Sequence, residues 1–529
     1  YAGDDSCHSF KSRIVSKKLK VIFMYKLNLI SGGTKISYQP LSISLKYLID
    51  DKKLEKSLPN LEKIFNIKFS ELQRKNFLSS DGGKIRVTKP SGKPDALILL
   101  KVKLDAKFDA DYFRNHLAEF IANMHSEVTK NLHIFIPAYT AVKKYFESED
   151  YYYQTFAEGV LLGNYSFDKY KSKKVKSKVI DVYFYSENEK KLKYAIAVAE
   201  KLITSVNLTR DLQNEPGNNL TPEIFAKRIV TEVKPFGIKT TVFGENEIQK
   251  RKMGGLIAIG QGSINKPRFI VLEYKPSIKS KKNKKAKTKT IALVGKGITF
   301  DTGGISLKPA KSMGEMKADM SGAAVVVGTL IAAAKNNLPV HLYGIIPSAE
   351  NMVSGESIRP GDIIKMSNGK SVEIEDTDAE GRVVLADALH YASQLKPDQI
   401  IDLATLTGAC VVALGEFVAG MFTKNEAMAE HLYKSGITTY DRVWRLPMWD
   451  DFNELITSDV ADVANLGSTR WAGAITAAKF LEHFVDKNIP WTHLDIAGPA
   501  MNNSSRSYTK KYMTGFGVRL LFDYLSMKI

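Results

Sequence analysis

Short apolar runs and amphipathic stretches alternate along most of the chain. In the first third, two mainly apolar runs, Ala96–Leu100 and Leu132–Ile136, have the length of buried strands. The segment Tyr112–Thr129 between them has the length and pattern of a helix. A strand, a helix and a strand in that order predict a small α/β domain, which we place at residues 24–185.

A long helix is predicted directly after this domain. Apolar positions recur at helical spacing over residues 186–212, and Ser186 can cap the helix, with the acidic Glu187 in its first turn. The segment Asn214–Asn219, which contains a proline followed by a glycine, ends the pattern. We expect this helix to link the first domain to a second one.

Residues 213–529 predict a larger C-terminal α/β domain. Its strand-like runs alternate with helical stripes, which is typical of a mixed, largely parallel sheet covered by helices. The predicted strands are Thr290–Ile298, His341–Ile346, Gln399–Ala404 and Thr492–Ile496. The predicted helices are Gly322–Lys335, Val383–Gln394 and Ala474–Val485. Ligands collect beyond the carboxyl ends of such strands, so motifs at Lys296, Thr405 and Ala497 are expected to meet at one rim.

The composition is that of an ordinary globular protein. Of 529 residues, 44% are hydrophobic and 25% are charged, and the length favours two domains. No apolar run reaches about 20 residues, so no membrane span is predicted. Cys7 and Cys410 lie far apart in the sequence and form no disulfide framework, which fits a reducing compartment. We expect a soluble cytoplasmic protein.

Residues 1–23 are basic and show no clear helix or strand pattern. We expect a disordered extension here. Its origin stays open, because the native chain can begin at Met24 or the segment can be a transit peptide. Asp4 and Asp5 argue against the transit peptide.

The net charge of +19 raises the question of a nucleic-acid partner. One dense run contains Lys279, Lys281, Lys282, Lys284, Lys285, Lys287 and Lys289. The run has neither interleaved aromatic residues nor arginines, so base stacking and bidentate phosphate recognition are not indicated. It lies between the strand-like segments Phe269–Leu272 and Thr290–Val294, which favours a solvated hairpin loop. Binding of nucleic acid or another polyanion is kept as the alternative function.

The densest chemistry lies in the stretch Glu375–Arg382, which holds four carboxylates, a glycine that can sharpen a bend, and an arginine. In an extended segment, the side chains of Asp378 and Glu380 point to the same side and repel each other unless a cation lies between them. An acidic surface loop is the alternative. Two more segments, Val294–Gly304 and Met316–Gly322, place further carboxylates beside glycines in apolar surroundings.

Each of these residues also has an ordinary structural role. Lys296 can form a salt bridge, Asp319 can cap a helix, and Asp301 can belong to a turn. The sequence has no His-Glu-x-x-His and no Cys-x-x-Cys motif, and His116 and His125 are spaced too far apart for a helical metal pair. Any metal here must therefore be bound mainly by oxygen.

The three segments together resemble the leucyl aminopeptidase (cytosol aminopeptidase) family of two-metal exopeptidases. The family signature is Asn-Thr-Asp-Ala-Glu-Gly-Arg, and the match extends from about Thr209 to the carboxyl terminus. Asp376 stands where the family usually has asparagine. The resemblance implies five metal ligands: Lys296, Asp301, Asp319, Asp378 and Glu380. A lysine can coordinate a metal only when it is deprotonated, and both burial and neighbouring dications lower its pKa.

The resemblance also implies the cofactors and a mechanism. The cofactors are two divalent ions per subunit, zinc and/or manganese with cobalt or magnesium as alternatives, and a bicarbonate or carbonate ion. A water acidified by both metals attacks the first peptide carbonyl. Lys308 stabilises the oxyanion, and Arg382 holds the bicarbonate together with the backbone amides of Ala379, Gly381 and Leu406.

The implied substrates are peptides with a free N-terminus and a neutral aliphatic first residue such as leucine or methionine. The corresponding substrate-binding positions are Met316, Asp376, Thr405, Leu406, Gly408 and Ala497. Ala500 stands where the family often has methionine, so the side-chain pocket is expected to differ in depth. The resemblance further implies a homohexamer built as a dimer of trimers. The alternative function then becomes a polyanion-binding protein on an aminopeptidase scaffold.

Overall fold

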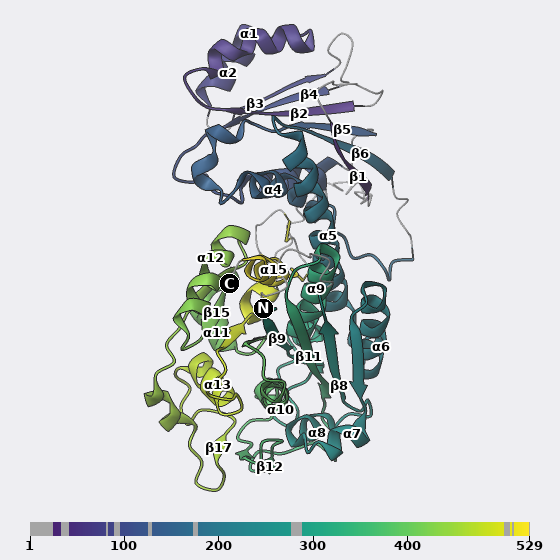
Figure 1. Ribbon diagram of the computed structural model, residues 1–529, viewed down its shortest axis with the longest axis vertical. Coiled ribbons are helices and arrows are strands. Elements are labelled where there is room, and N and C mark those ends of the chain that lie inside the picture. The colour runs from purple at the N-terminus through teal and green to yellow at the C-terminus, as the bar shows by residue number, and fades with distance from the viewer. Residues whose placement is uncertain are drawn as a thin grey trace, which may run out of the picture.

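The computed structural model describes residues 25–32, 42–80, 83–88, 96–124, 130–172, 178–276, 288–501, 508–509 and 513–527. These residues form two α/β bodies, one above the other in Figure 1, with helix α5 running from the upper body into the lower one. This confirms the predicted fold class. Residues 1–23, Cys7, His125 and all of the lysine run except Lys289 lie outside the described residues.

The upper body is built on a six-stranded sheet in the order β1-β6-β5-β2-β4-β3. All neighbours are parallel except β3 and β4. The strands are β1 (Tyr25–Ser31), β2 (Ser42–Ile49), β3 (Lys84–Thr88), β4 (Ala96–Val102), β5 (Asn131–Phe135) and β6 (Lys178–Tyr185).

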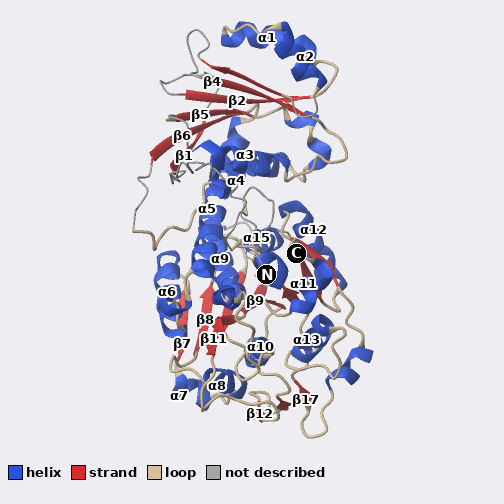
Figure 2. Ribbon diagram, turned by 180° about the vertical axis from the view of Figure 1, so that it is seen from behind, coloured by secondary structure: helices blue, strands red, loops and turns tan. Residues whose placement is uncertain are grey.

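Helices cover both faces of this sheet, as Figure 2 shows. On one face lie α1 (Leu54–Phe65) and α2 (Glu71–Ser79), and on the other lie α3 (Tyr112–Asn123) and α4 (Glu149–Gly163). Alternate residues of β4 serve the two cores, with Leu97 packed toward the first pair of helices and Ile98 toward the second. Burial on both faces explains why residues 96–100 of β4 form a continuous apolar run.

The linking helix α5 (Glu189–Asn214) starts three residues later than predicted. The predicted cap, Ser186, is wrong, because β6 extends to Tyr185 and the cap is Asn188. The Asn188 side chain accepts a hydrogen bond from the amide of Lys191 at 3.3 Å. Along its length α5 packs against both α4 and α9 (Ser321–Asn336), so it belongs to both bodies.

The lower body is built on a nine-stranded mixed sheet in the order β16-β15-β18-β14-β9-β11-β8-β7, with β10 beside β11. The four central strands, β18, β14, β9 and β11, are parallel. The strands are β7 (Lys239–Phe243), β8 (Arg268–Tyr274), β9 (Thr290–Gly295), β10 (Gly297–Asp301), β11 (His341–Asn351), β14 (Gln399–Ala404), β15 (Val418–Phe422), β16 (Arg442–Arg445) and β18 (Trp491–Asp495). A small second sheet contains β12 (Ile363–Lys365), β13 (Ser371–Glu373) and β17 (Val463–Ala464).

Helices again lie on both faces of the large sheet. One core contains α5 and α9 together with α6 (Pro222–Val233), α12 (Glu426–Thr439) and α15 (Val518–Ser526). The other contains α7 (Glu245–Lys250), α8 (Gly254–Gly260), α10 (Glu380–Gln394) and α13 (Gly473–Glu482). Two short helices, α11 (Gly408–Leu414) and α14 (Ala497–Ala500), follow strands β14 and β18.

Short 3₁₀ turns connect several of these elements. They are η2 (Tyr139–Ala141), η3 (Lys143–Tyr145), η4 (Gly217–Asn219), η5 (Lys234–Phe236), η6 (Met313–Ala318) and η7 (Asp450–Ile456). Of these, η6 leads directly into α9.

The predicted single strand Thr290–Ile298 is wrong, because it is broken at Lys296 into β9 and β10. Strand β9 pairs with residues 341–345 of β11, whereas β10 pairs with residues 348–351. At the break, the Lys296 amide donates to the carbonyl of Leu403 at 3.1 Å, and the Lys296 carbonyl accepts from the amide of Ala323 at 2.9 Å. A residue that leaves the ladder in this way can direct its side chain toward the strand ends.

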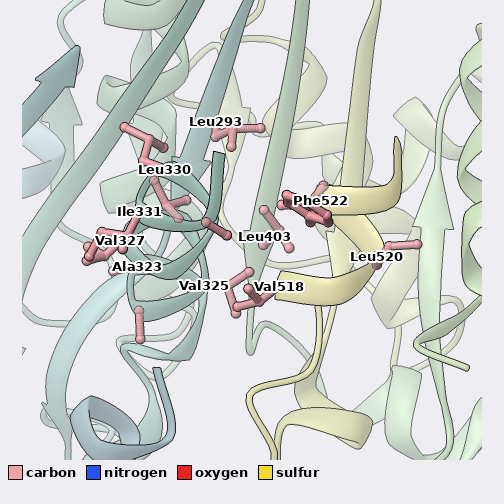
Figure 3. Packing of buried hydrophobic residues seen from close by; sticks show 14 of the residues in the cluster. Leu293, Ala323, Val325, Val327, Leu330, Ile331, Leu403, Val518, Leu520 and Phe522 are labelled. Carbon is pink, nitrogen blue, oxygen red and sulfur yellow. The ribbon is translucent and has the colours of Figure 1, made fainter. Parts of the chain in front are cut away.

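Helix α9 is the centre of the larger core. Figure 3 shows Val325, Leu330 and other α9 side chains packed against strand residues Leu293 and Leu403 and against Val518 from α15. Among the described residues, the segment from η6 through α9 is long and apolar enough to cross a membrane. However, 89% of its apolar window is buried inside the protein, which identifies α9 as a core helix.

Polar contacts also join the two bodies. The buried carboxylate of Asp111 on the upper body accepts hydrogen bonds from Arg114 at 2.8 Å and from the Tyr508 hydroxyl at 2.9 Å. The Tyr151 hydroxyl donates to the carbonyl of Thr438 in α12. Within the upper body, His116 contacts the Tyr47 hydroxyl at 3.0 Å, so its ring takes part in the packing there.

Replacing a central α9 side chain should destabilise the protein far more than replacing an exposed one. Leu330 is fully buried, so Leu330→Ala is expected to lower the free energy of unfolding by about 3 kcal/mol through lost burial and a residual cavity. Ile264 is 93% exposed, so Ile264→Ala should change it by less than about 0.5 kcal/mol. Denaturant unfolding measures both, and equal losses would contradict this account of the core.

Candidate metal centre

Acidic and basic side chains from three segments meet beyond the carboxyl ends of the central strands. Lys296 lies between β9 and β10, Asp301 ends β10, and Asp319 lies between η6 and α9. Glu380 is the first residue of α10, and Asp378 lies two residues before it. The expected convergence of these five residues is therefore present in the structure.

Lys296 is the centre of one half of the cluster. Its ammonium lies 2.7 and 2.8 Å from the two carboxylate oxygens of Asp319 and 2.8 Å from Oε1 of Glu380. It also donates to the carbonyl of Thr405 at 3.0 Å. Thr405 in turn donates from its hydroxyl to Oδ1 of Asp319 at 2.7 Å. This half therefore joins the ends of β9 and β14 to the start of α9.

Lys308 is the centre of the other half. Its ammonium lies 2.8 Å from Oδ2 of Asp301 and also contacts Oδ1 of Asp378. Carboxylate oxygens of Asp301, Asp378 and Glu380 all lie within 4.8 Å of one another, and Glu380 also contacts Lys296. Glu380 thus connects the two halves, and the arrangement leaves three carboxylates facing one small volume.

The pKa values reflect burial and crowding of like charges. Burial raises the pKa of Asp378 to about 6, and the charge of Asp301 acts in the same direction. Burial likewise raises the pKa of Asp319 and of Glu380. Burial lowers the pKa of the Lys296 ammonium, but the negative charges of Asp319 and Glu380 outweigh it and raise that pKa above its ordinary value. The ammonium groups of the two lysines therefore neutralise part of the negative charge of the carboxylates, and this charge favours the binding of cations.

The residues present fit divalent metal ions. Oδ2 of Asp319 and Oε1 of Glu380 are buried and accept no hydrogen bond, although each lies close to the Lys296 ammonium. Buried carboxylate oxygens without a donor are costly unless a cation balances them. Several carboxylates around one volume also match the oxygen ligands of hard and borderline dications.

Arg382 lies beside this cluster in the first turn of α10. Its side chain is only 5% exposed, and burial lowers the pKa of its guanidinium to about 10. One of its Nη atoms donates to the carbonyl of Asn465 at 2.9 Å, whereas its Nε is buried and has no partner. A buried, unpaired guanidinium N–H at a helix N-terminus fits a small anion.

Of the amides expected around that anion, two already have acceptors. The amide of Ala379 donates to the carbonyl of Asp376 at 3.2 Å, and that of Leu406 donates to Oδ1 of Asp495 at 3.2 Å. The amide of Gly381 lies in the first turn of α10, where N–H groups have no intrahelical acceptor. Arg382 and Gly381 are therefore the donors best placed for an anion.

Gly381 has a different role from the bend that its sequence context suggested. It lies inside α10 and has no left-handed backbone conformation. A Cβ at this position would come within 2.4 Å of Cε and 2.6 Å of Nζ of Lys296. The glycine therefore makes room for the Lys296 side chain. By contrast, Gly303 and Gly304 do have positive φ angles, of 87° and 68°, in the turn after Asp301.

The residues expected to bind the substrate differ in exposure. Thr405 is buried, Met316, Leu406, Asp376 and Ala497 are half-buried, and Gly408 is exposed. Ala500, the other departure from the family pattern, is fully buried and belongs to the α9 core.

Several positioning residues were missed by sequence reasoning. Asn351 donates to Oδ1 of Asp301 at 2.9 Å and to the carbonyl of Thr377 at 3.0 Å. Asn465 donates to the carbonyl of Asp376 at 2.8 Å. Asp495 accepts from the hydroxyl of Thr407 at 2.6 Å as well as from the Leu406 amide. Asn351 and Asp495 each end a strand beside the rim, which is the one sequence signal that could have identified them.

Helix α10 is anchored deeper in the protein by Asp387. This carboxylate is fully buried and accepts hydrogen bonds from the amides of Leu256 at 3.1 Å and Ser367 at 2.9 Å. Burial raises its pKa to about 6, although these N–H groups oppose the shift. The anchor fixes the helix that carries Glu380 and Arg382.

Comparisons with known proteins agree with this arrangement. Residues 207–522 match the model of the cytosol aminopeptidase family, catalytic domain, and residues 45–174 match its N-terminal domain. A probable cytosol aminopeptidase of Persephonella marina is 42% identical over 505 residues, which cover 94% of this chain and 99% of that protein. A probable cytosol aminopeptidase of Aquifex aeolicus is 43% identical over 457 residues, covering 86% and 89%.

Two solved structures are similar over almost the whole chain. A tomato leucine aminopeptidase mutant superposes with a TM-score of 0.81 at 30% identity, covering 95% of this chain and 97% of that one. The bottromycin maturation enzyme BotP in complex with Mn superposes with a TM-score of 0.77 at 31% identity, covering 92% and 99%.

The buried Asp387 should make stability depend on pH in a defined window. Its folded pKa of about 6 exceeds the unfolded value of about 3.9, so its contribution to stability is complete below pH 3.9 and is lost as the pH rises through about 6. We expect the wild type to lose about 2 kcal/mol relative to Asp387→Asn between pH 4 and pH 7. Denaturant unfolding at several pH values measures this difference, and parallel pH profiles would contradict it.

Proposed function

This chain belongs to the cytosol aminopeptidase family, and on that premise we propose that it releases neutral aliphatic residues, such as leucine or methionine, from peptide N-termini. It is a metal-dependent aminopeptidase, a hydrolase that acts on peptides. The observation that carries the proposed mechanism is the meeting of Asp301, Asp378 and Glu380 between the ammonium groups of Lys296 and Lys308.

Two divalent ions would be held by Lys296, Asp301, Asp319, Asp378 and Glu380. When bound, such ions supply Lewis acidity, which lowers the pKa of a water molecule and polarises a peptide carbonyl. Zinc and/or manganese are proposed, with cobalt or magnesium as alternatives. The Mn in the complex of the similar bottromycin maturation enzyme supports manganese.

Lys308 is proposed to stabilise the negative charge that develops on the carbonyl oxygen. Its ammonium is held in place by Asp301 and Asp378, and its side chain is 21% exposed, so one side of it can reach a substrate. A cation that is already oriented costs little reorganisation during the reaction. The crowded carboxylates also favour a substrate that brings a free amino group, which agrees with exopeptidase action.

Arg382 is proposed to hold a bicarbonate or carbonate ion through its unpaired Nε, together with the amide of Gly381. Ala379 and Leu406 are secondary candidates, because their amides already donate within the chain. A carbonate held by these donors would supply a base for the proton of the attacking water.

The first side chain of the substrate is proposed to lie against Met316, Thr405, Leu406, Gly408 and Ala497, with Asp376 on the other side of the cluster. A flexible methionine beside small residues suits aliphatic and thioether side chains. A homohexamer built as a dimer of trimers and a cytoplasmic location are proposed by family membership. The polyanion-binding alternative is not favoured, since the relatives that match nearly the full chain are peptidases.

Activity should depend on metal and on Glu380. In a leucine amide assay, chelation should abolish hydrolysis, and added manganese or zinc should restore it. Glu380→Ala should lower kcat at least about 1000-fold, because it removes the carboxylate shared by both halves of the site. Glu375→Gln, an exposed neighbour, is the control and should retain activity. Failure of the wild type on leucine, methionine and alanine amides with every metal would overturn the proposal.

Activity should also depend on bicarbonate through Arg382. Arg382→Ala is expected to lower kcat about 100-fold, because a positioned base contributes about that much, and to remove the response of kcat to added bicarbonate. Arg359→Ala is the matched control, since its side chain is 73% exposed. The measurement is kcat in bicarbonate-depleted buffer with increasing bicarbonate. A variant that still responds like the wild type would show that Arg382 does not hold the anion.

A further inference from the structure

A cavity of about 410 Å³ lies where the upper body meets the lower one. Helices α4 and α5 line it on one side, and α15 and the end of α9 line it on the other; all four lie near the junction in Figure 1. Two of its lining residues, Tyr194 and Lys201 on α5, are exposed, so the cavity opens to solvent. Its volume is in the range of sites for small molecules.

Two opposite charges on α15 line this cavity without pairing with each other. Arg519 and Asp523 are four residues apart, so they lie on the same side of the helix. No ion pair joins them in the part of the chain that the structure describes. Each also has a buried atom without a hydrogen-bond partner, Nη1 of Arg519 and Oδ2 of Asp523. Such atoms are costly to bury unless another group binds them.

The other contacts of Arg519 orient its guanidinium. Its Nη2 donates to Oδ1 of Asp441 at 2.7 Å, and Asp441 does not line this cavity. Its Nη1 lies toward Glu158, which does line the cavity and whose Oε2 is 3.9 Å away. That oxygen already accepts a hydrogen bond from Nε of Arg114 at 2.5 Å. Nη1 is therefore available to a carboxylate from outside the chain.

The surroundings of Asp523 favour a cation. Burial raises the pKa of its carboxyl group to about 6, and the negative charges of Glu147 and Glu158 act in the same direction. The Lys434 ammonium opposes this shift, but it pairs with Glu147 at 3.1 Å. Because a pKa of about 6 lies below neutral pH, the Asp523 carboxylate is mainly ionised there.

Apolar side chains form another part of the cavity wall. Val198 and Leu202 on α5, Leu338 after α9, and Phe522 on α15 all line it. Leu202 and Phe522 are buried members of the α9 core, so this part of the wall is fixed by the packing of the lower body. The cavity therefore combines one positive charge, one negative charge and an apolar surface.

This cavity is separate from the metal centre. Asp319 lies just before the start of α9, whereas Asn336 ends α9 and lines the cavity. A helix of 16 residues is about 24 Å long. The two sites therefore lie at opposite ends of α9.

We propose that this cavity binds a free α-amino acid with an apolar side chain. The ammonium group of the ligand pairs with Oδ2 of Asp523, and its carboxylate pairs with Nη1 of Arg519. Its side chain packs against the apolar part of the wall. Such amino acids include the products of the proposed hydrolysis, but the site itself does not depend on that function.

Equilibrium dialysis with radiolabelled leucine tests the site. The metal-loaded protein is measured before and after chelation, because leucine held by the metal centre is lost with the metal and leucine in the cavity stays. One chelation-resistant site per chain is expected. Asp523→Asn should weaken this binding about tenfold, because it removes a charged hydrogen-bond acceptor. Asp451→Asn is the matched control, since Asp451 is exposed and does not line the cavity.

Two analogues of leucine test whether both charges are needed. 3-Methylbutylamine lacks the carboxylate, and 4-methylpentanoate lacks the ammonium group. Each is expected to displace radiolabelled leucine only at concentrations at least about tenfold higher than those of unlabelled leucine. Circular dichroism of Asp523→Asn should match that of the wild type, so that weaker binding is not caused by loss of the fold.

Three results would overturn the proposal. The first is wild-type protein without chelation-resistant leucine binding, and the second is equal binding by Asp523→Asn and the wild type. The third is displacement by 3-methylbutylamine as effective as that by leucine, which would assign the cavity to simple organic cations. Dialysis measures binding alone, so failure of the peptidase assays would overturn the proposed function and leave this inference standing.

Discussion

The crowding of carboxylates at the end of the central strands is the constraint on which the rest of the lower body depends. Asp301, Asp319, Asp378 and Glu380 repel one another, and burial makes that repulsion stronger. Positive charge must therefore be supplied close by. Lys296 and Lys308 supply it from within the chain, and the same oxygens suit divalent cations. Because a buried charge without a partner is costly, the surrounding backbone must hold every member of the cluster in place.

The fold meets this demand by bringing strand ends and helix starts to one edge of the sheet. The break after β9 releases Lys296 from the ladder, and the start of α10 presents Glu380 and then Arg382. Asn351 and Asn465 connect these segments through their amide groups. The apolar helix α9 supports this edge of the sheet, because its first residues pack directly on Lys296 and Leu403. The backbone at the start of α9 therefore takes part both in the apolar core and in positioning the polar site.

Much of this organisation could be predicted from the sequence. Helices α9, α10 and α13 and strands β14 and β18 were predicted within a few residues, because their apolar periodicity is strong and local. Strand β11 was predicted to end at Ile346 but continues to Asn351. The family resemblance rested on long motifs and is confirmed by the comparisons. The carboxylates of the cluster were found because several acidic residues beside glycines form an unusual local pattern.

Other features depend on partners far away in the chain, which no local pattern reveals. At Lys296 the pairing with β11 is interrupted between Val294 and Gly297, and the Lys296 carbonyl accepts a hydrogen bond from the distant amide of Ala323. The local sequence pattern does not show this interruption, so β9 and β10 were predicted as one strand. Single polar residues such as Asn465 and Asp495 acquire their roles only when folding brings their partners to them. Asn188 caps α5 in place of Ser186 because the preceding strand runs further than its sequence suggests.

The contact between Gly381 and Lys296 has a consequence for how this site can change over evolutionary time. The end of the Lys296 side chain occupies the space that a Cβ at 381 would need, so a side chain there would push the lysine away from its carboxylate partners. A lineage that keeps the lysine must keep the glycine, whereas loss of the lysine removes the restriction on its partner. We therefore expect residues 296 and 381 to be substituted together in a descendant that has lost this metal chemistry. A larger residue at 381 would mark such a descendant even where every carboxylate remained.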